Sequence, residues 1–246
     1  MQSELFAEAN RESAAPGQRW VRQSSKMLRV DTRGLDVIAA KGAMVAYQGE
    51  IQFEHESSGS MTKFLKQAVT GEGAPLMRMS GQGEVFLARD AQDIFTVELA
   101  EEGLTVNGDS LLAFDHTLDW DITMMRGAGM MAGGLFNLQI SGRGTVAVSC
   151  DGQPLVLDCS QQPTYVDPQA AVCWSSNLTP SIVSTTTFRS MLRGGTGEAF
   201  QLAFHGPGFV VVQPSEGRPK PAQAASGSGN SGSSDGRQGL LGGLFN

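Results

Sequence analysis

The chain has 246 residues, of which 17% are charged and 40% hydrophobic, and 31 are glycine. Low charge and abundant glycine exclude a coiled coil and an all-helical bundle, and glycine does not recur at every third position as in collagen. No apolar run approaches about 20 residues, so no membrane-spanning helix is expected. The net charge of −7 argues against nucleic-acid binding, because an acidic body repels phosphate.

Residues 1–26 are predicted to be a polar N-terminal extension. They lack the basic stretch and the following apolar stretch of a secretory signal, and three glutamates argue against a mitochondrial transit peptide. The chain has 3 cysteines, an odd number, and we expect all of them to be reduced and mostly buried. Together these features predict a cytoplasmic protein.

Two motifs alternate through residues 27–213, and each occurs three times. In the first, an aliphatic residue, a small residue and an aromatic residue precede three variable positions and an aliphatic residue; the aromatic residues are Tyr47, Phe114 and Trp174. The second is Gly-x-Gly-x-Val followed by apolar residues, with the glycines Gly81, Gly83, Gly142, Gly144, Gly206 and Gly208. The repeat predicts three tandem homologous units, at about 27–90, 91–150 and 151–213.

Each unit is expected to be β structure, because its apolar runs are short, rich in aliphatic and aromatic residues, and broken by Gly, Asp and Asn. The predicted fold class is all-β, with three β-sandwich-like units in a pseudo-threefold arrangement. The Gly-x-Gly pairs are expected at the starts of strands, where a bend or bulge needs a residue without Cβ. Their role is structural, since glycine loops that bind phosphate precede helices. One helical pattern covers residues 60–68.

Two strand runs lack a neighbour in this repeat. The last Gly-x-Gly strand, 209–213, has no run after it, and the first run, 27–31, has no Gly-x-Gly strand before it. We predict that these two pair, because the pairing would close the body and cover both edges. After them, residues 214–239 are predicted to be a flexible Gly/Ser/Pro linker and residues 240–246 an apolar tip.

The sequence has none of the motifs of a nucleophile elbow, a zinc-protease helix, a Cys-x-x-Cys site or a phosphate-binding loop. Its strongest polar group is Asp115, Asp119 and Asp121, which would share one face of a single strand. A solvated strand face is preferred over a cation site, because metal ligands usually converge from several segments. We therefore expect no enzyme, no metal and no cofactor.

Candidate binding residues come from a methionine-rich stretch of the second unit, from its equivalents in the other units, and from the C-terminal tip. These side chains could fill an irregular core. Alternatively, the three stretches cluster at one end of the body and bind a protein partner, a neighbouring subunit or a lipid surface. The candidates are Met61, Phe64, Leu65, Met130, Met131, Phe188, Met191, Leu192, Leu240, Leu241, Leu244 and Phe245.

The segments GGLFNLQISGRGTVAV and GGTGEAFQLAFHGPGFVVVQ, within the pattern from about Met27 to Gln213, resemble the family of altered inheritance of mitochondria protein 24, the mitochondrial biogenesis family. The resemblance implies three units similar to the tryptophan RNA-binding attenuation protein. It also implies mostly bacterial members without a known biochemical role or catalytic residues, and a mitochondrial member linked to inner-membrane organisation. Without a transit peptide, a bacterial cytoplasmic protein is favoured.

The sequence thus predicts a non-enzymatic interaction or scaffold protein. It would self-associate as a homo-oligomer, or bind protein partners, through its apolar loop segments and its tip. Two alternatives stay open. One is a small-molecule or nucleic-acid binding module that uses one polar face of the same fold. The other is an organiser of a membrane surface through peripheral contact.

Overall fold

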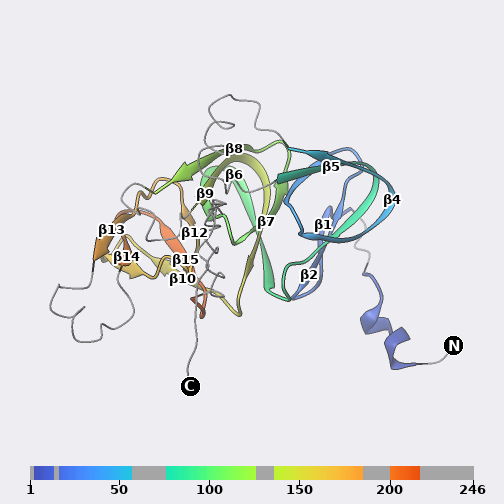
Figure 1. Ribbon diagram of the computed structural model, residues 1–246, viewed down its shortest axis with the longest axis horizontal. Helices are drawn as coiled ribbons and strands as arrows, with labels where there is room; N and C mark the ends of the chain where they lie inside the picture. Colours follow the sequence, from blue (N-terminus) through green and yellow to red (C-terminus); the bar gives the residue numbers. More distant parts are fainter. Residues whose placement is uncertain (1–2, 14–16, 57–75, 126–135, 185–199, 217–246) are drawn as a thin grey trace, which may run out of the picture.

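The computed structural model describes residues 3–13, 17–56, 76–125, 136–184 and 200–216. In these residues the chain forms strands and two short 3₁₀ helices, so the predicted all-β class is confirmed (Figure 1). The 3₁₀ helices are η1 (Glu4–Phe6) and η2 (Glu8–Asn10). The strands are β1 (Trp20–Ser24), β2 (Met27–Asp31), β3 (Val37–Ala40), β4 (Met44–His55), β5 (Leu76–Leu87), β6 (Asp93–Asn107), β7 (Leu111–Asp115), β8 (Asp119–Met124), β9 (Phe136–Cys150), β10 (Leu155–Asp158), β11 (Thr164–Val166), β12 (Ala171–Ser175), β13 (Ser181–Ser184), β14 (Phe200–Phe204) and β15 (Phe209–Val212).

The strands after β1 fall into three sets. Each set contains three successive stretches of chain, which we call its first, second and third paths. The first path is β2 with β3 in set one, the long strand β6 in set two, and β10 with β11 in set three. The second path is β4, then β7 with β8, then β12 with β13. The third path carries the Gly-x-Gly motif and is β5, then β9, then β14 with β15. In every set the third path pairs antiparallel with both other paths.

Two further strand pairs join the sets in a row. β3 of set one pairs with β7 of set two, and β6 of set two pairs with β12 of set three, both antiparallel. These junctions build one 12-stranded sheet, beside a smaller sheet of order β11-β14-β13. The row places β4 at one end of the molecule and β13 and β14 at the other (Figure 1).

The strand register is the same in all three sets. In each, the aromatic residue of the first motif lies opposite a valine of the third path: Tyr47 with Val85, Phe114 with Val146 and Trp174 with Val210. An irregularity interrupts the pairing just before each aromatic residue, between Met44 and Ala46, Leu111 and Ala113, and Ala171 and Cys173. The repeated register means that each second path begins with the same local backbone shape.

The predicted pairing of residues 27–31 with residues 209–213 is wrong. β2 pairs with β5 on one side and with β1 on the other. β15 lies between β10 and β12. The prediction failed because β1, Trp20–Ser24, lies in the stretch expected to be a polar extension, and this strand takes the edge of β2 for which a partner was sought.

All three copies of the Gly-x-Gly motif lie in the third path; the prediction that they precede a strand is wrong for the first two copies and holds for the third, which directly precedes β15. The first two copies are in the middle of β5 and β9, and the third connects β14 with β15. At the second glycine of β5 the neighbouring backbone is very close: a Cβ on Gly83 would lie 2.1 Å from the carbonyl oxygen of Gln48. The first glycine of each copy has a positive φ, of 122° at Gly81, 112° at Gly142 and 124° at Gly206.

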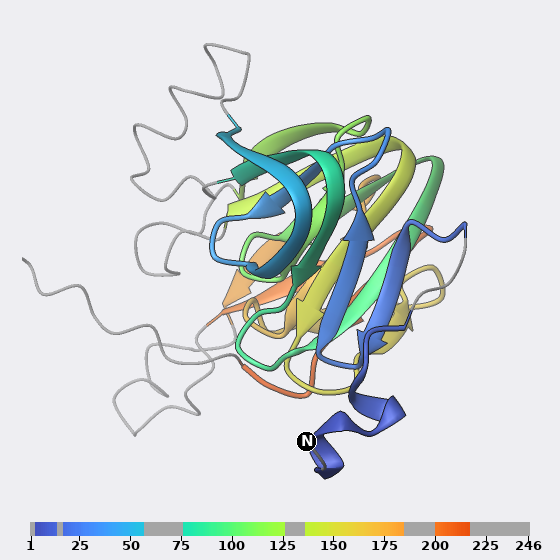
Figure 2. The same cartoon turned by 90° about the vertical axis from the view of Figure 1, so that its right-hand side faces the viewer.

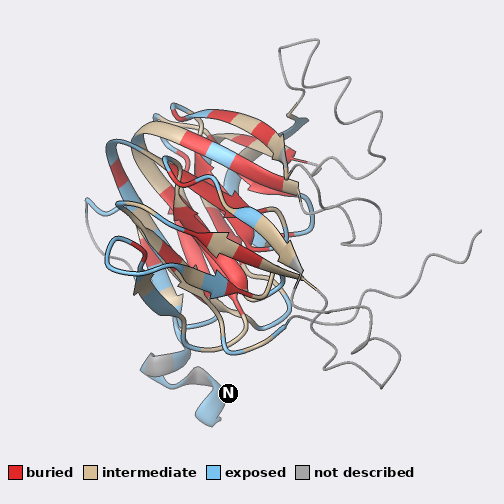
Figure 3. Cartoon of the chain, turned by 90° about the vertical axis from the view of Figure 1, so that its left-hand side faces the viewer, coloured by how far each residue is buried: buried red, intermediate tan, exposed pale blue. Residues whose placement is uncertain are grey.

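Apolar side chains are buried inside each set and across the junctions (Figure 3). The cluster at the centre of the row contains Phe114 and Trp120 of set two, whose rings lie edge to face with centroids 6.3 Å apart. It also includes Ile38 of set one and Val172 of set three. The junctions between sets are therefore held by side-chain packing as well as by backbone pairing.

The three cysteines, Cys150, Cys159 and Cys173, are buried free thiols, as predicted. Burial raises the pKa of the Cys150 thiol to about 11 and the pKa of the Cys173 thiol to about 12. The thiolate is the reactive form of cysteine, so both groups stay protonated and unreactive at neutral pH.

Three predicted features lie outside the described residues: the helical pattern over 60–68, most of the linker, and the tip at 240–246. In the part of the chain that the structure describes, no helix is both long enough and apolar enough to cross a membrane.

Substitution of Gly83 by Ala tests the close approach of β5 to β4. We expect Gly83→Ala to lower the free energy of unfolding by about 3 kcal/mol, because the new methyl group meets backbone that cannot move aside. Gly42→Ala is the control: Gly42 has a φ of +86° but nothing lies within 4 Å of an added Cβ, so only the cost of the left-handed conformation, about 1 kcal/mol, is expected. Equal losses in urea unfolding would contradict the close contact.

Thiol labelling tests the burial of the cysteines. At pH 8 we expect the folded protein to react with an aromatic disulfide reagent far more slowly than the chain in guanidinium chloride, where all 3 cysteines react. Labelling of the folded protein at the rate of the unfolded chain would show that these thiols are accessible.

Candidate functional site

The residues proposed from the sequence to bind partners all lie outside the described part of the chain, so the structure does not place them. It does place the hairpins that lead to them. The pairs β4–β5, β8–β9 and β13–β14 are antiparallel. The ends of these hairpins that border residues 57–75, 126–135 and 185–199 open toward the same side of the body (Figure 2).

The structure reveals a different set of exposed apolar side chains. In set one, the second-path strand β4 exposes Val45, Tyr47 and Phe53. In set three, the first-path strands expose Leu155 and Val156 on β10 and Tyr165 on β11. These six residues lie in the two outer sets of the row, and we call them the end residues.

The positions equivalent to Tyr47 in the rest of the row are buried. Tyr47 is 50% exposed, whereas Phe114 and Trp174, at the same place in sets two and three, are 0% and 2% exposed. In sets two and three this position is covered by the strand of the preceding set, β3 or β6. In the described structure, β4 pairs only with β5, so its outer side has no such cover.

β11 shows the complementary situation. Tyr165 is 57% exposed, whereas Ile38 and Thr105, at the same place in sets one and two, are 1% and 7% exposed. On this side β3 pairs with β7 of the next set, and β6 pairs with β12 of the next set. β11 pairs only with β14 among the described strands. The row therefore ends in two different strand edges, both with large apolar side chains.

Sequence reasoning missed the end residues because they belong to the repeat. The motif around Tyr47 resembles that around Phe114, because an aliphatic, a small and an aromatic residue follow one another in both. The exposure of the end residues follows from the order of the strand sets: in the described structure a row of three has a first and a last set, and each lacks one neighbour.

The prediction of a solvated aspartate face is wrong for Asp115. This residue ends β7, and the turn before β8 separates it from the other aspartates. Its carboxylate is buried, 5% exposed, and accepts hydrogen bonds from the Nε of Arg19 at 2.9 Å, the Nε1 of Trp20 at 3.1 Å and the backbone N of Thr145 at 2.8 Å. These three hydrogen bonds give the carboxylate a structural role.

Arg19 uses this carboxylate to clamp the first junction. Its guanidinium also donates to the backbone oxygens of Asp31, Leu35 and Asp36. The segment before β3 is thus tied to the end of β7, where Val37 lies opposite Asp115. Because a carboxylate bonded to Arg is a strong and directional partner, the clamp fixes the register of sets one and two.

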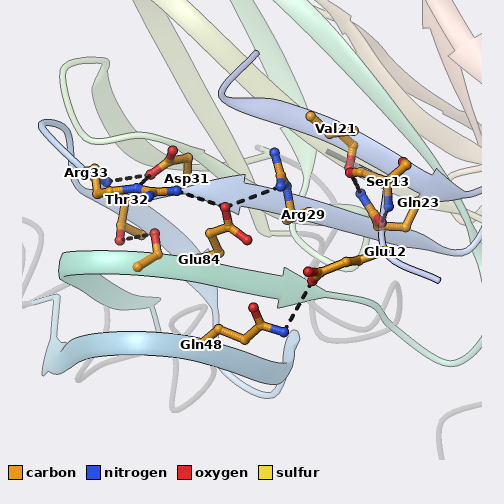
Figure 4. A network of polar contacts seen from close by, with 11 residues as sticks. Glu12, Ser13, Val21, Gln23, Arg29, Asp31, Thr32, Arg33, Gln48 and Glu84 are labelled. Atoms are coloured by element: carbon orange, nitrogen blue, oxygen red, sulfur yellow. Dashed lines mark hydrogen bonds and ion pairs between the residues drawn. The ribbon is translucent and has the colours of Figure 1, made fainter. Parts of the chain in front are cut away.

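A second polar cluster covers the outside of set one (Figure 4). Glu84 accepts from Nη1 of Arg29 at 3.2 Å and from Nη2 of Arg33 at 2.9 Å, and Nε of Arg33 donates to Asp31 at 2.9 Å. The hydrogen bond from Arg33 holds the pKa of Asp31 below its usual value. Opposite charges alternate through this cluster, which is typical of a structural ion-pair network.

Among the described residues, no group of three or more His, Cys, Asp or Glu side chains could hold a metal ion. One hollow of about 320 Å³ lies beside β1, and its walls contain a single charged residue, Arg22. A lone cation with apolar neighbours supplies no general base there. The hollow is lined by Trp20, Arg22, Leu28, Ile94, Phe95 and Thr96.

Removal of the Asp115 carboxylate tests the clamp. We expect Asp115→Ala to lower the free energy of unfolding by about 3 kcal/mol, because it leaves the Arg19 charge without its partner. Ser175→Ala is the matched comparison: Ser175 holds the same place in set three, and its hydroxyl accepts one hydrogen bond, from the backbone N of Phe209 at 3.1 Å. A loss of about 1 kcal/mol is expected there. A loss as small at Asp115 would show that the clamp contributes little.

Comparison with known proteins gives a family and a similar fold. The family model described as "Mitochondrial biogenesis AIM24" matches residues 19–215. The X-ray crystal structure of protein SPYM3_0169 from Streptococcus pyogenes has a TM-score of 0.64 and 22% sequence identity, covering 79% of this chain and 91% of that chain; at this identity it shows likeness of fold alone. No curated protein matches the chain. The family match begins just before β1 and continues beyond β15, and the chain belongs to the mitochondrial biogenesis AIM24 family.

Proposed function

We propose that this protein is a non-enzymatic interaction protein, which associates with itself or with protein partners as a scaffold in the cytoplasm. The position of the end residues carries the proposal. Large apolar side chains are exposed where the row of strand sets begins and where it ends. Apolar groups beside open strand edges favour association with another polypeptide, because the partner covers the side chains and pairs with the backbone.

The proposal includes three homologous units, which correspond to the three sets of strands. The second glycine of each motif supports this assignment. A Cβ at this glycine would meet the residues one and four positions after the aromatic residue of the same set: Gln48 and Ile51 for Gly83, Asp115 and Leu118 for Gly144, and Ser175 and Leu178 for Gly208. Close packing that recurs at equal offsets is expected of units that derive from one ancestor.

A hydrogen bond repeats at the same place. The backbone N of Thr145, which follows the second glycine of set two, donates to the Asp115 carboxylate. The backbone N of Phe209, which follows the second glycine of set three, donates to the Ser175 hydroxyl. Aspartate and serine differ in charge, yet each supplies an oxygen at the same position, which supports common descent with divergent side chains.

A binding role is further supported by the use of polar groups. The Asp115 carboxylate and the Glu84 carboxylate are both engaged with arginines that join strands. Groups committed to such contacts are part of the framework and are not positioned to exchange protons with a substrate.

Size-exclusion chromatography with light scattering tests the proposed association. At micromolar concentrations the full-length protein should have a mass above that of one 26.0 kDa chain. Val45→Lys should weaken association at least about tenfold, since burial of an unpaired charge costs more than about 1.4 kcal/mol. The control Thr117→Lys, at an exposed position between β7 and β8, should leave the mass unchanged.

The same experiment on a chain that ends at Gln213 tests the C-terminal tip. Dissociation of this shorter chain would assign the association to the tip, and an unchanged mass would assign it to the strand body. A full-length protein that stays monomeric at every concentration would contradict self-association. If that monomer floats with anionic lipid vesicles, the membrane-organiser alternative gains instead.

A further inference from the structure

The row of three strand sets has two unlike ends that complement each other. At the first end, the outer side of β4 is bordered by Val45 and Tyr47; at the last end, the outer side of β11 is bordered by Tyr165. The ends lie on opposite sides of the molecule (Figure 1). An edge strand in the described structure offers unpaired backbone donors and acceptors, which a partner strand can use.

The two internal junctions show how such edges join. In the first junction β3 pairs with β7, and Ile38 lies opposite Phe114. In the second, β6 pairs with β12, and Thr105 lies opposite Trp174. Both junctions are antiparallel and use the same equivalent positions, so one geometry is used twice. Within a single chain the described strands do not form a third junction of this kind, because β11 and β4 lie at opposite ends of the row.

We propose that two copies of this chain join head to tail, with β11 of one copy paired antiparallel to β4 of the next. The register follows from the internal junctions: Tyr165 lies opposite Tyr47, Thr164 opposite Gln48, and Val166 opposite Ala46. This inference rests on the proposed self-association and names its partner and its site. The junction between copies would bury two tyrosines that are half exposed in one chain.

Both surfaces are shaped for a second copy. β4 has the irregularity between Met44 and Ala46 that β7 and β12 have at the edges joined to β3 and β6. β11 is held by β14 in the register in which β3 is held by β5: Thr164 lies opposite Phe204 as Val37 lies opposite Met79. The β4 edge therefore resembles the edges of β7 and β12, and β11 resembles the strand β3 that pairs with such an edge. A general hydrophobic patch would not show this match.

The described N-terminal segment leaves this edge accessible. It touches β4 through one exposed hydrogen bond, from Nε2 of Gln48 to Oε2 of Glu12 at 3.2 Å (Figure 4). A hydrogen bond of this kind contributes about 1 kcal/mol or less, so a partner strand can displace it. The two surfaces of this contact differ. A row of joined copies therefore always has one unpaired β4 end and one unpaired β11 end. The assembly grows until these two ends pair and close it.

A mixing experiment with two full-length variants tests the head-to-tail contact. Tyr47→Glu disables the β4 end and keeps β11; Tyr165→Glu disables the β11 end and keeps β4. Each variant alone should have the mass of one chain by light scattering. An equimolar mixture should have the mass of two chains, because only one productive contact remains. Both substitutions are at exposed positions, and circular dichroism checks that each variant is folded.

Oxidative cross-linking tests the register. Opposite residues of an antiparallel pair have Cα atoms about 4.5–5.5 Å apart, within the range of a disulfide. A mixture of Tyr47→Cys and Tyr165→Cys chains should therefore form a disulfide between the two variants. Thr117→Cys is the control, since Thr117 is exposed between β7 and β8 and lies outside the proposed contact; with Tyr165→Cys it should cross-link at least tenfold less.

Three outcomes would overturn the head-to-tail contact. A mixture of glutamate variants that stays monomeric, while the unsubstituted protein is an oligomer, would show that self-association uses another surface; the proposed function would stand. Either glutamate variant alone keeping the mass of the unsubstituted protein would have the same meaning. A protein that is monomeric without substitution would remove both the contact and the proposed self-association.

Discussion

The fold depends on the close contact between the third path of each set and the second path beside it. The strand of the third path pairs with two neighbours that lie in different directions, so it has to bend. The bend has to fall where the strand contacts the second path. Glycine meets both requirements: Gly81 takes a φ of 122°, and Gly83 leaves space that the Gln48 carbonyl fills. In sets two and three the second glycine faces side chains of the second path: a Cβ would lie 3.2 Å from Asp115 at Gly144 and 2.9 Å from Ser175 at Gly208. The second glycine thus lies against the second path in all three sets, and the two junctions between sets are alike.

Much of this architecture could be predicted from the sequence. The spacing of the Gly-x-Gly pairs and of Tyr47, Phe114 and Trp174 reflects the actual strand register, because in every set the second glycine lies against the residues that follow the aromatic one. The glycines of the first two copies were assigned to the wrong part of the strand, since a local pattern of glycine and valine does not distinguish a strand that begins from one that bends. β1 was missed because Trp20–Ser24 contains polar residues typical of an exposed edge.

The candidate site could not be found in the same way. Exposure of Tyr47 is a property of its place in the row and not of its neighbours in sequence, since the equivalent Phe114 is completely buried. Asp115 was similarly misjudged: a short acidic run suggests a solvated face, but the carboxylate meets Arg19 from 96 positions away in the chain. Partners this remote appear only when the strands are assembled.

A row of strand sets that pair edge to edge leaves an edge strand at each end. The outermost sets present the same kind of strand edge that joins one set to the next, so the proposed association between chains would use the interaction that stabilises the chain itself. Charged residues and proline usually protect such edges. Here Glu50 and Glu54 lie further along β4 and Pro163 directly precedes β11, but the positions equivalent to the internal junctions carry the exposed Tyr47 and Tyr165.

Amide hydrogen exchange at increasing protein concentration tests this account most directly, because it measures backbone pairing strand by strand. If copies join through the two ends of the row, protection at residues 44–48 of β4 and 164–166 of β11 should rise together with concentration. Protection of β1, whose outer side takes no part in the contact, should stay constant. Constant exchange at both ends, or a rise at only one of them, would contradict the account.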